Sequence, residues 1–427
     1  MKVEVVEGKM KGKIFLFDGH DALVFGRARE CHCCLPDDRL VSRHHFLLEV
    51  SAPLARLRDL GSLNGTRVNG RKCGGRKPGE SPEQGGKRRY PEVDLHDGDV
   101  VKVGDTVMRL KVEGKRIPPN VQSDEVREEV AHLLFDLDDR KHDKARELIQ
   151  REIGNYELRK EIGRGGFGAV YLGRRIRTGE TIAVKVMLSR VAVGKPMLAK
   201  FLREIQNTAA LSHRNIVRVL DFGSSKGMFF LFMEYCDGGS VDRLLEAHGG
   251  KLPLEICKPI MLDTLDGIQY AHERGVVHRD VKPSNLLLSF SKTELTAKVA
   301  DFGLAKGFER AGFSGLTLTG ASGGTPYFMP REQVLNFKYV KPTSDIWSAA
   351  ATFYNMLTGA LPRDYVAGRD PLEVVLRESA VPILCRGSAV PKEIAAIIDR
   401  ALCDEVGGRY SNAGEMRDSL VRAFRAG

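Results

Sequence analysis

Two polar strings, close together in the second half of the chain, constrain this protein more than any other feature. They are His278-Arg279-Asp280-Val281-Lys282-Pro283-Ser284-Asn285 and, beginning sixteen residues after Asn285, Asp301-Phe302-Gly303. Asp280 is a carboxylate that can accept a hydroxyl proton, and Lys282 is a cation that can stabilise a moving phosphoryl group. Asn285 and Asp301 offer the oxygen ligands that Mg²⁺ prefers. The order and spacing of these groups indicate phosphoryl transfer from Mg-ATP.

A glycine-rich string lies upstream of these residues. It reads Ile-Gly-Arg-Gly-Gly-Phe-Gly-Ala-Val from 162 to 170, with glycines at Gly163, Gly165 and Gly168. Glycines allow a tight turn to fold over phosphates without a Cβ in the way. A dinucleotide-binding loop has similar glycines, but a helix would follow it directly. Here the strand-like Ile182-Ala183-Val184-Lys185 comes next, which favours a loop that covers the phosphates of ATP.

Together these strings resemble the bacterial (Hanks-type) serine/threonine protein kinases, because Lys282 follows Asp280 by two residues as in that branch of the family. The resemblance implies a bilobal α+β kinase fold over residues 155–427 and transfer of the γ-phosphoryl of ATP to protein Ser and Thr hydroxyls. It assigns the catalytic roles to Asp280, Lys282, Lys185 and Glu204, with Glu204 paired to Lys185. It assigns the nucleotide to Gly163, Gly165, Gly168, Val170, Ala183, Lys185, Glu234, Cys236 and Leu287, and Mg²⁺ to Asn285 and Asp301.

The segment 324–332 resembles the substrate-docking segment of the same family, with one departure. The usual Ala-Pro-Glu is Pro330-Arg331-Glu332 in this chain, which is expected to shift the local backbone. By resemblance, Glu332 is expected to pair with Arg409. The length of the segment that ends here favours protein substrates over small-molecule phosphotransfer.

Two threonines precede the docking segment at an offset where similar bacterial kinases autophosphorylate. They are Thr317 and Thr319. A phosphate would add about −1.5 to −2 charge, and Arg279 could clamp it. The hypothesis is an activation switch; the alternative is a pair of exposed loop hydroxyls.

The first 115 residues predict a different fold, an all-β sandwich. Short β-rich runs recur between turn residues, and a Gly-, Pro- and charge-rich insertion at 73–93 is expected to be a mobile surface loop. The strings at 25–27, 41–45 and 59–70 resemble the forkhead-associated (FHA) domains, which bind phosphothreonine. The resemblance implies that the phosphothreonine-binding residues are Arg27, Ser42, Arg43 and Asn64, and that His45 supports the loop.

Residues 116–154 are expected to form a linker with an amphipathic helix. Ser123 can cap this helix, and apolar residues recur at three- and four-residue steps at Val126, Val130, Leu133, Leu134 and Leu137. The apolar face is expected to pack on a neighbouring domain; a regulatory or dimerising helix is the alternative.

Composition narrows the class of protein further. The net charge of +10 is spread over the whole chain, which favours a solvated surface over a nucleic-acid site. The chain has no long uncharged apolar run and no secretory signal, so we expect no membrane span and a cytoplasmic location. Cys31, Cys33 and Cys34 flank His32, but this is not the usual zinc spacing, so a surface loop is favoured.

The sequence thus predicts an enzyme that makes phosphothreonine and a module that reads it. The expected partners are protein substrates and phosphothreonine proteins, with self-association in trans through Thr317 or Thr319 left open. The alternative is a catalytically weak kinase-fold scaffold that mainly binds phosphothreonine. The complete catalytic set argues against that alternative.

Overall fold

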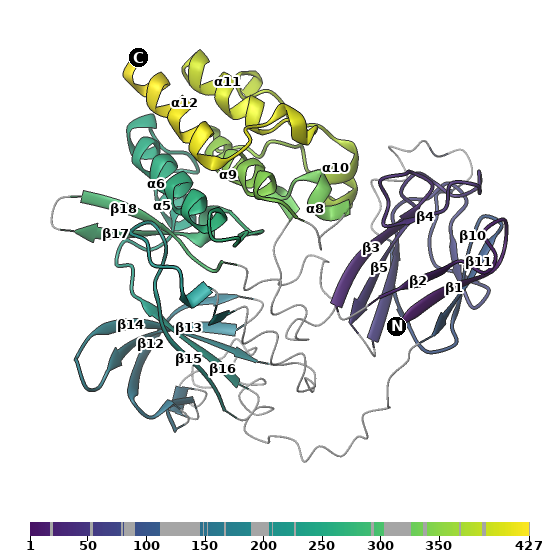
Figure 1. Cartoon of the computed structure of the whole chain (residues 1–427), viewed down its shortest axis with the longest axis horizontal. Coiled ribbons are helices and arrows are strands. Elements are labelled where there is room, and N and C mark those ends of the chain that lie inside the picture. The colour runs from purple at the N-terminus through teal and green to yellow at the C-terminus, as the bar shows by residue number, and fades with distance from the viewer. Residues whose placement is uncertain are drawn as a thin grey trace. The chain divides into compact units, whose positions relative to one another are not determined.

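The computed structural model covers the 427-residue chain, and most of both predicted regions can be described from it (Figure 1). The described residues are 1–17, 20–51, 54–77, 80, 90–111, 146–147, 149–151, 153–165, 168–188, 205–206, 208–225, 228–291, 294–302, 326–335, 340–366, 369–386 and 390–426. The predicted helix face at 126–137, Glu204, Thr317 and Thr319 lie outside these residues.

Contacts divide the chain into two compact units. The first contains Met1–Arg116, Thr325–Asn355 and Ala360–Ser411, and the second contains Ile117–Gly324, Met356–Gly359 and Asn412–Gly427.

The N-terminal residues form a sandwich of two sheets, which confirms the predicted all-β fold of this region (Figure 1). The first sheet has the order β2-β1-β11-β10-β7-β8, formed by β1 (Lys2–Glu7), β2 (Ile14–Leu16), β7 (Thr66–Val68), β8 (Arg71–Lys72), β10 (Val100–Val103) and β11 (Thr106–Lys111). The second has the order β4-β3-β5-β6-β9, formed by β3 (His20–Gly26), β4 (Cys33–Cys34), β5 (Phe46–Ser51), β6 (Leu54–Asp59) and β9 (Glu92–Leu95).

Alternating side chains build the core between these sheets. In β1, Val3 and Val5 are buried between more exposed neighbours, as the period of two in a strand requires. Phe25 and Phe46 stack at the centre with ring centroids 4.5 Å apart. Strand β9 begins at Glu92, inside the predicted insertion, because Val93 packs against this core.

The second unit contains an antiparallel sheet with the order β12-β13-β14-β16-β15. Its strands are β12 (Tyr156–Gly165), β13 (Gly168–Arg175), β14 (Thr181–Leu188), β15 (Val219–Ser225) and β16 (Met228–Glu234). In β14, Ile182 and Val184 face one apolar cluster while Ala183 and Met187 face another. This alternation places Lys185 on the same side as Ala183, opposite Val170 in β13 and Leu231 in β16.

The last described residues of the predicted linker pack on this sheet. Residues 146–147, 149–151 and 153 are helical, and Ile149 and Ile153 are buried in the cluster formed by the sheet. Gln150 fixes the contact, because its Nε2 donates to Tyr156 O at 2.7 Å and its Oε1 accepts from Leu158 N at 2.7 Å.

Helices follow the sheet in the rest of the chain. The second unit holds α5 (Val241–Ala247), α6 (Leu254–His272), the 3₁₀ turn η1 (Pro283–Asn285), the hairpin β17 (Leu286–Ser291) and β18 (Glu294–Val299), and α12 (Ala413–Ala426). The first unit holds η2 (Pro326–Phe328), α8 (Arg331–Leu335), all but the last residues of α9 (Pro342–Thr358), α10 (Pro371–Arg377), η4 (Ile383–Arg386), α11 (Lys392–Ala401) and η5 (Val406–Gly408). Within the described part of the chain, no helix has the length and apolar character needed to cross a membrane.

Candidate active site and phosphate-reading loops

The string at 278–285 folds into a loop between α6 and β17 that gathers its polar side chains. Lys282 Nζ lies 2.8 Å from Asp280 Oδ2. Asn285 Nδ2 donates to Asp280 O at 2.7 Å and to Asp280 Oδ2 at 3.0 Å. The acid, the cation and the amide that the sequence singled out are therefore in contact with one another.

His278 supports this loop through hydrogen bonds from its buried side chain. Its side chain is buried; Nε2 donates to Ala300 O at 2.7 Å, and Nδ1 accepts from Asp280 N at 3.1 Å. Since one ring nitrogen donates and the other accepts, the ring is held as the neutral Nε2–H tautomer. His278 thus ties Asp280 to the residue before Asp301.

The backbone at this site is strained at two positions. Arg279 has φ of 72° and Asp301 has φ of 63°, in the left-handed region that non-glycine residues rarely adopt. Such strain persists only where the surroundings hold it in place. Here Ala300, next to Asp301, donates from its N to Asn285 O at 2.8 Å and accepts from His278.

Asp301 faces the lysine of the five-stranded sheet. Lys185 Nζ lies 2.6 Å from Asp301 Oδ2. Burial acts to raise the pKa of Asp301, but the charge and hydrogen bond of Lys185 outweigh it, so the pKa lies below its usual value. The carboxylate is therefore ionised near neutral pH, as a metal ligand must be.

The two predicted metal ligands suit Mg²⁺ by their chemistry. Asp301 supplies an ionised carboxylate, and Asn285 has its amide nitrogen committed to Asp280, which leaves its oxygen for a cation. Carboxylate and amide oxygens are hard ligands of the kind Mg²⁺ takes, usually with waters and phosphate oxygens completing the shell.

The predicted nucleotide residues gather in an apolar cluster beside Lys185. Its buried members include Ala183, Met233 and Cys236, and partly buried Val170 and Leu287 pack against them. Burial raises the pKa of the Cys236 thiol to about 12, so it stays protonated and acts as an apolar group. The cluster can bind the flat, apolar faces of a purine.

The glycines of the 162–170 string differ in how much space surrounds each of them. A Cβ on Gly168, which has φ of 147°, would meet Val186 O at 1.9 Å, so only glycine fits there. A Cβ on Gly163 would meet no atom within 4 Å. Packing therefore explains Gly168, while no contact within the described part of the protein requires glycine at position 163. Gly165 pairs with Gly168 at the end of the β12–β13 hairpin.

The side chain of Glu234 has a role that the sequence did not predict. Lys298 Nζ lies 3.0 and 3.1 Å from its two oxygens, and Arg218 N donates to it at 2.6 Å. The backbone N of Glu234 donates to Arg218 O at 3.0 Å, so both the side chain and the amide of Glu234 are bonded within the protein. The partner, Lys298, lies 64 residues away in β18, so no local pattern could identify it.

Further along the chain, Arg409 forms the predicted pair with Glu332. Its Nη1 and Nη2 donate to the two carboxylate oxygens at 2.6 and 3.0 Å, and the side chain of Arg409 is fully buried. Ser344 Oγ also donates to Glu332 at 2.8 Å. This bidentate pair fixes the start of α8 despite the sequence departure at Pro330-Arg331.

At one end of the N-terminal sandwich, three loops bring the predicted phosphothreonine residues together. Arg27 N donates to Ser42 O at 2.9 Å, and Ser42 Oγ accepts from Leu63 N at 2.9 Å. Asn64 Nδ2 donates to Leu40 O at 2.8 Å. The side chains of Arg27, Arg43 and Asn64 are exposed, as a site for a phosphopeptide requires.

His45 holds these loops in place from the interior. It is buried, accepts from Ser42 N at 3.0 Å through Nδ1, and contacts Gly65 O at 3.2 Å through Nε2. Burial lowers the pKa of His45, so the ring is neutral at pH 7. The supporting position expected for His45 is confirmed by these contacts.

The expected surface loop at Cys31–Cys34 is wrong. Cys33 and Cys34 form strand β4, and Cys31 and Cys33 are buried because their thiols are small and apolar enough for the sandwich. Cys31 Sγ donates to Arg43 O at 3.2 Å, and burial raises its pKa to about 12. His32 Nδ1 accepts from Val24 N at 3.2 Å. The string supports the backbone of the phosphate-reading loops.

Comparison with known proteins gives the class of these two regions. Residues 156–420 match the family model for the protein kinase domain, and residues 23–104 match that for the FHA domain. The chain belongs to the protein kinase family and carries an FHA domain at its N-terminus. The predicted fold class, an FHA-like sandwich followed by a kinase fold, is thereby confirmed.

Among curated proteins, the chain is similar to bacterial serine/threonine kinases. It is 33% identical over 274 residues to the serine/threonine-protein kinase PknB of Mycobacterium tuberculosis, covering 62% of this chain and 42% of that protein. It is 30% identical over 275 residues to the serine/threonine-protein kinase pkn2 of Myxococcus xanthus, covering 64% and 33%. The chain thus spans well under half the length of these relatives.

Proposed function

We propose that this chain is an ATP-dependent, non-specific serine/threonine protein kinase that transfers the γ-phosphoryl of Mg-ATP to protein hydroxyls. The observation that carries the proposal is the contact of Asp280 with Lys282 and Asn285, beside the Lys185–Asp301 pair. These groups supply a base, two cations and two metal ligands from three segments: the loop 278–285, strand β14 and the residues that follow β18. Relatives named serine/threonine-protein kinases support the same activity.

In this mechanism each residue has a distinct task. Asp280 accepts the proton of the substrate hydroxyl as the hydroxyl oxygen attacks the γ-phosphorus; the bond from that phosphorus to the bridging oxygen breaks, and ADP leaves. Lys282, 2.8 Å from Asp280, stabilises the charge of the transferred group. Lys185 holds the α- and β-phosphates, and the apolar cluster around Ala183 holds the adenine. Mg²⁺ on Asn285 and Asp301 would neutralise the charge on the phosphates.

The proposal extends to regulation. Phosphate on Thr317 or Thr319 would be clamped by Arg279, which follows the buried His278 in the catalytic loop. The FHA domain would bind phosphothreonine through Arg27, Arg43, Ser42 and Asn64, on substrates or on another copy of the chain. A cytoplasmic location belongs to the proposal, because all eight cysteines carry free thiols.

Phosphosite mapping tests the activity and the switch together. We expect the dephosphorylated full chain, incubated with Mg-ATP, to gain phosphate on Ser or Thr, including Thr317 or Thr319. A matched sample with EDTA should gain none, because the metal ligands would be empty. Phosphate elsewhere but on neither threonine would refute the switch. No phosphate at all would favour the phosphothreonine-binding scaffold over the enzyme.

A further inference from the structure

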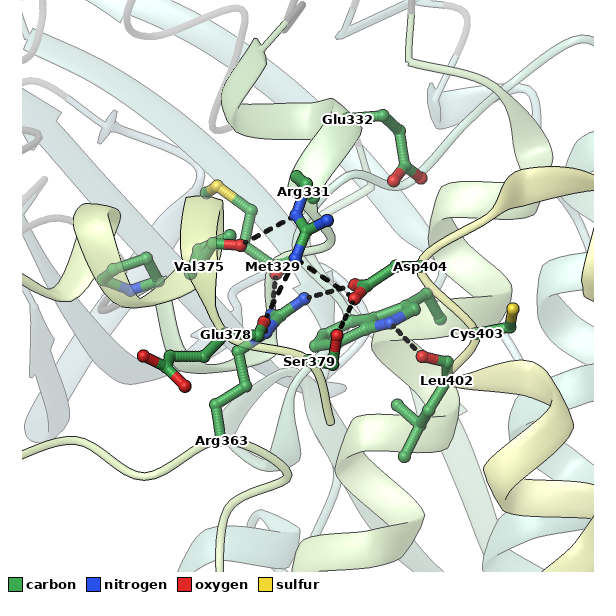
Figure 2. Close-up of polar contacts among 12 residues, drawn as sticks. Met329, Arg331, Glu332, Arg363, Val375, Glu378, Ser379, Leu402, Cys403 and Asp404 are labelled. Carbon is green, nitrogen blue, oxygen red and sulfur yellow. Dashed lines mark hydrogen bonds and ion pairs between the residues drawn. The ribbon is translucent and has the colours of Figure 1, made fainter. Parts of the chain in front are cut away.

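The unusual Arg331 of the docking segment belongs to a partly buried network of charges (Figure 2). Its Nη2 lies 3.1 Å from Asp404 Oδ2, in the loop after α11. Its Nε and Nη2 also lie 3.4 Å from the carbonyl oxygens of Val375 and Glu378, at the end of α10. Arg331, the first residue of α8, is therefore connected to two other segments of the same unit.

A second arginine completes the network from the opposite side. Arg363 has a side chain with 0% exposure, and its guanidinium lies 4.4 Å above the ring of Trp347. It donates to Asp404 Oδ1 at 3.2 Å and to Glu378 O at 2.9 Å. Its Nη1 donates to Met329 O at 3.0 Å, so this buried cation also holds the docking segment just before α8.

The two arginines share the carboxylate of Asp404, but they differ in how deeply their side chains are buried. Asp404 is 15% exposed and also accepts from Ser379 Oγ at 2.7 Å. Loss of Asp404 would leave the buried Arg363 without its counter-ion, which is costly to folding. Loss of Arg331, which is 29% exposed, leaves the Arg363–Asp404 pair intact. Arg331 can therefore be changed without dismantling the interior.

The network pins the docking segment at neighbouring positions. Arg363 holds Met329, Asp404 holds Arg331, and Arg409 holds Glu332. Arg409 Nη2 also donates to Asp404 O at 3.2 Å, so the last two anchors share one attachment point. A proline at position 331, as in the family pattern, could form none of the Arg331 contacts, because it has no guanidinium.

We propose that Arg331 is a positioning residue for protein substrates, which through Asp404 and the end of α10 holds the docking segment in the shape that receives them. The proposal rests on the proposed kinase function. A docking segment that already has its binding conformation loses less conformational entropy when a substrate binds, so it binds the substrate more tightly. Arg331 touches neither the nucleotide cluster nor the catalytic loop in the described contacts, so its effect should fall on the protein substrate and not on ATP.

The test compares Arg331→Gln with Arg331→Lys in the full chain, with Arg369→Gln as the matched control. Arg369 pairs with the Glu378 side chain at 2.8 Å near the same end of α10, and within the described part of the chain it makes no hydrogen bond or ion pair with the docking segment. With myelin basic protein as substrate, we expect Arg331→Gln to raise its KM by about five- to tenfold, the loss of one charge-assisted contact. The KM for ATP and kcat should change by less than about twofold.

Arg331→Lys should give an intermediate KM, because lysine keeps the charge toward Asp404 but lacks the fork that also reaches the two carbonyls. Arg369→Gln should behave like the wild type. A raised KM for Arg331→Gln with partial recovery in Arg331→Lys is a pattern that loss of general stability would not produce.

Hydrogen exchange provides a readout independent of activity. The amides of Met329 and Gln333 are hydrogen-bonded to Pro326 O and Pro330 O, so they should exchange slowly in the wild type and faster in Arg331→Gln. Unchanged exchange rates of these amides in Arg331→Gln would show that Arg331 does not anchor the docking segment. Faster exchange with an unchanged protein KM would overturn the positioning role. If the wild type transferred no phosphate, the proposed function would fail, while exchange would still decide whether Arg331 anchors the segment.

Discussion

The two phosphate-handling regions of this chain arrange their cations in opposite ways. Lys185 and Lys282 each lie within 2.8 Å of a carboxylate oxygen in the kinase region. In the FHA domain, by contrast, Arg27 and Arg43 are exposed, and within the described part of the chain neither forms an ion pair with a carboxylate. The loops that carry them are supported from the interior by His45.

This difference follows from what each region would do with phosphate. A site that binds phosphothreonine must attract a dianion, so its cationic side chains should be exposed and without a carboxylate partner before the ligand binds. A transferring site must also hold a base and a metal, so its cations sit among carboxylates that carry out those tasks. The comparison predicts that the two activities can be removed separately.

Among the variants that separate the two regions, the largest effect is expected from Lys185→Met, which removes the partner of Asp301. Loss of one preorganised charge at the transferring phosphate should lower kcat by about 10²–10³-fold. The affinity of the FHA domain for a phosphothreonine peptide should not change. Lys258→Met serves as the control, because Lys258 pairs with the exposed Glu255. If Lys185→Met kept wild-type turnover, the Lys185–Asp301 pair would have no catalytic role.

The converse variant, Arg27→Ala, should weaken phosphothreonine binding by the FHA domain and leave phosphate transfer by the kinase domain unchanged. We expect the affinity for a phosphothreonine peptide to fall by about 10–100-fold, the value of one hydrogen bond to a charged group. Phosphate transfer to myelin basic protein should be unchanged. Calorimetric titration of the full chain measures this, with Arg67→Ala, an exposed arginine that contacts Gly70 O, as control. Equal affinities in both variants would exclude Arg27 from the site.

The supporting histidines make the FHA domain the more acid-sensitive region. Burial lowers the pKa of His32 and of His44 to about 4 from 6.5, and lowers that of His45. The unfolded chain then binds more protons than the folded one between about pH 6.5 and 4, so stability falls as the pH drops through this window. Asp301 has a lowered pKa, so its contribution is lost only below its usual value of 3.8.

Hydrogen exchange at pH 7 and pH 5, corrected for intrinsic rates, can locate this loss. The sandwich should lose about 1–3 kcal/mol of protection at pH 5, whereas the catalytic loop should not. His32→Gln should reduce the loss, while His96→Gln, at an exposed side chain, should not. Equal losses in both regions would contradict the assignment to buried histidines.

A smaller effect is expected at the nucleotide-binding strand. Glu234→Gln would break the pair with Lys298 but keep an oxygen for Arg218 N. Since the pair is partly exposed, we expect the KM for ATP to rise by only about two- to fivefold. Glu294→Gln, in an exposed pair with Arg214, is the matched control. A KM for ATP equal to that of the control would show that Lys298 does not position this strand.

The sequence predicted the parts of both sites that lie in short strings. Asp280, Lys282 and Asn285 are close in the chain, and a single loop brings them together, so their contact followed from spacing alone. The support that His45 gives to Ser42 was expected from the resemblance to FHA domains. Short β-rich runs between turn residues predicted the sandwich, because strand and turn propensities are local properties of the sequence.

The contacts that the sequence did not predict join distant segments. Lys298 contacts Glu234, Cys31 contacts Arg43 O, and Arg331 is linked to Arg363 through Asp404 and Glu378 O. None of these pairs has a characteristic spacing, because each depends on how whole elements pack. The departure at Pro330-Arg331 was visible in the sequence, but its partner could be found only from the structure.

The central claim, that this chain transfers phosphate through Asp280, is tested most directly by one rate. Transfer from [γ-³²P]ATP to myelin basic protein should be measured for the wild type and for Asp280→Asn, which keeps the size of the side chain but removes the base. We predict a fall in kcat of about 10²–10⁴-fold. Equal rates in the two proteins would contradict the claim.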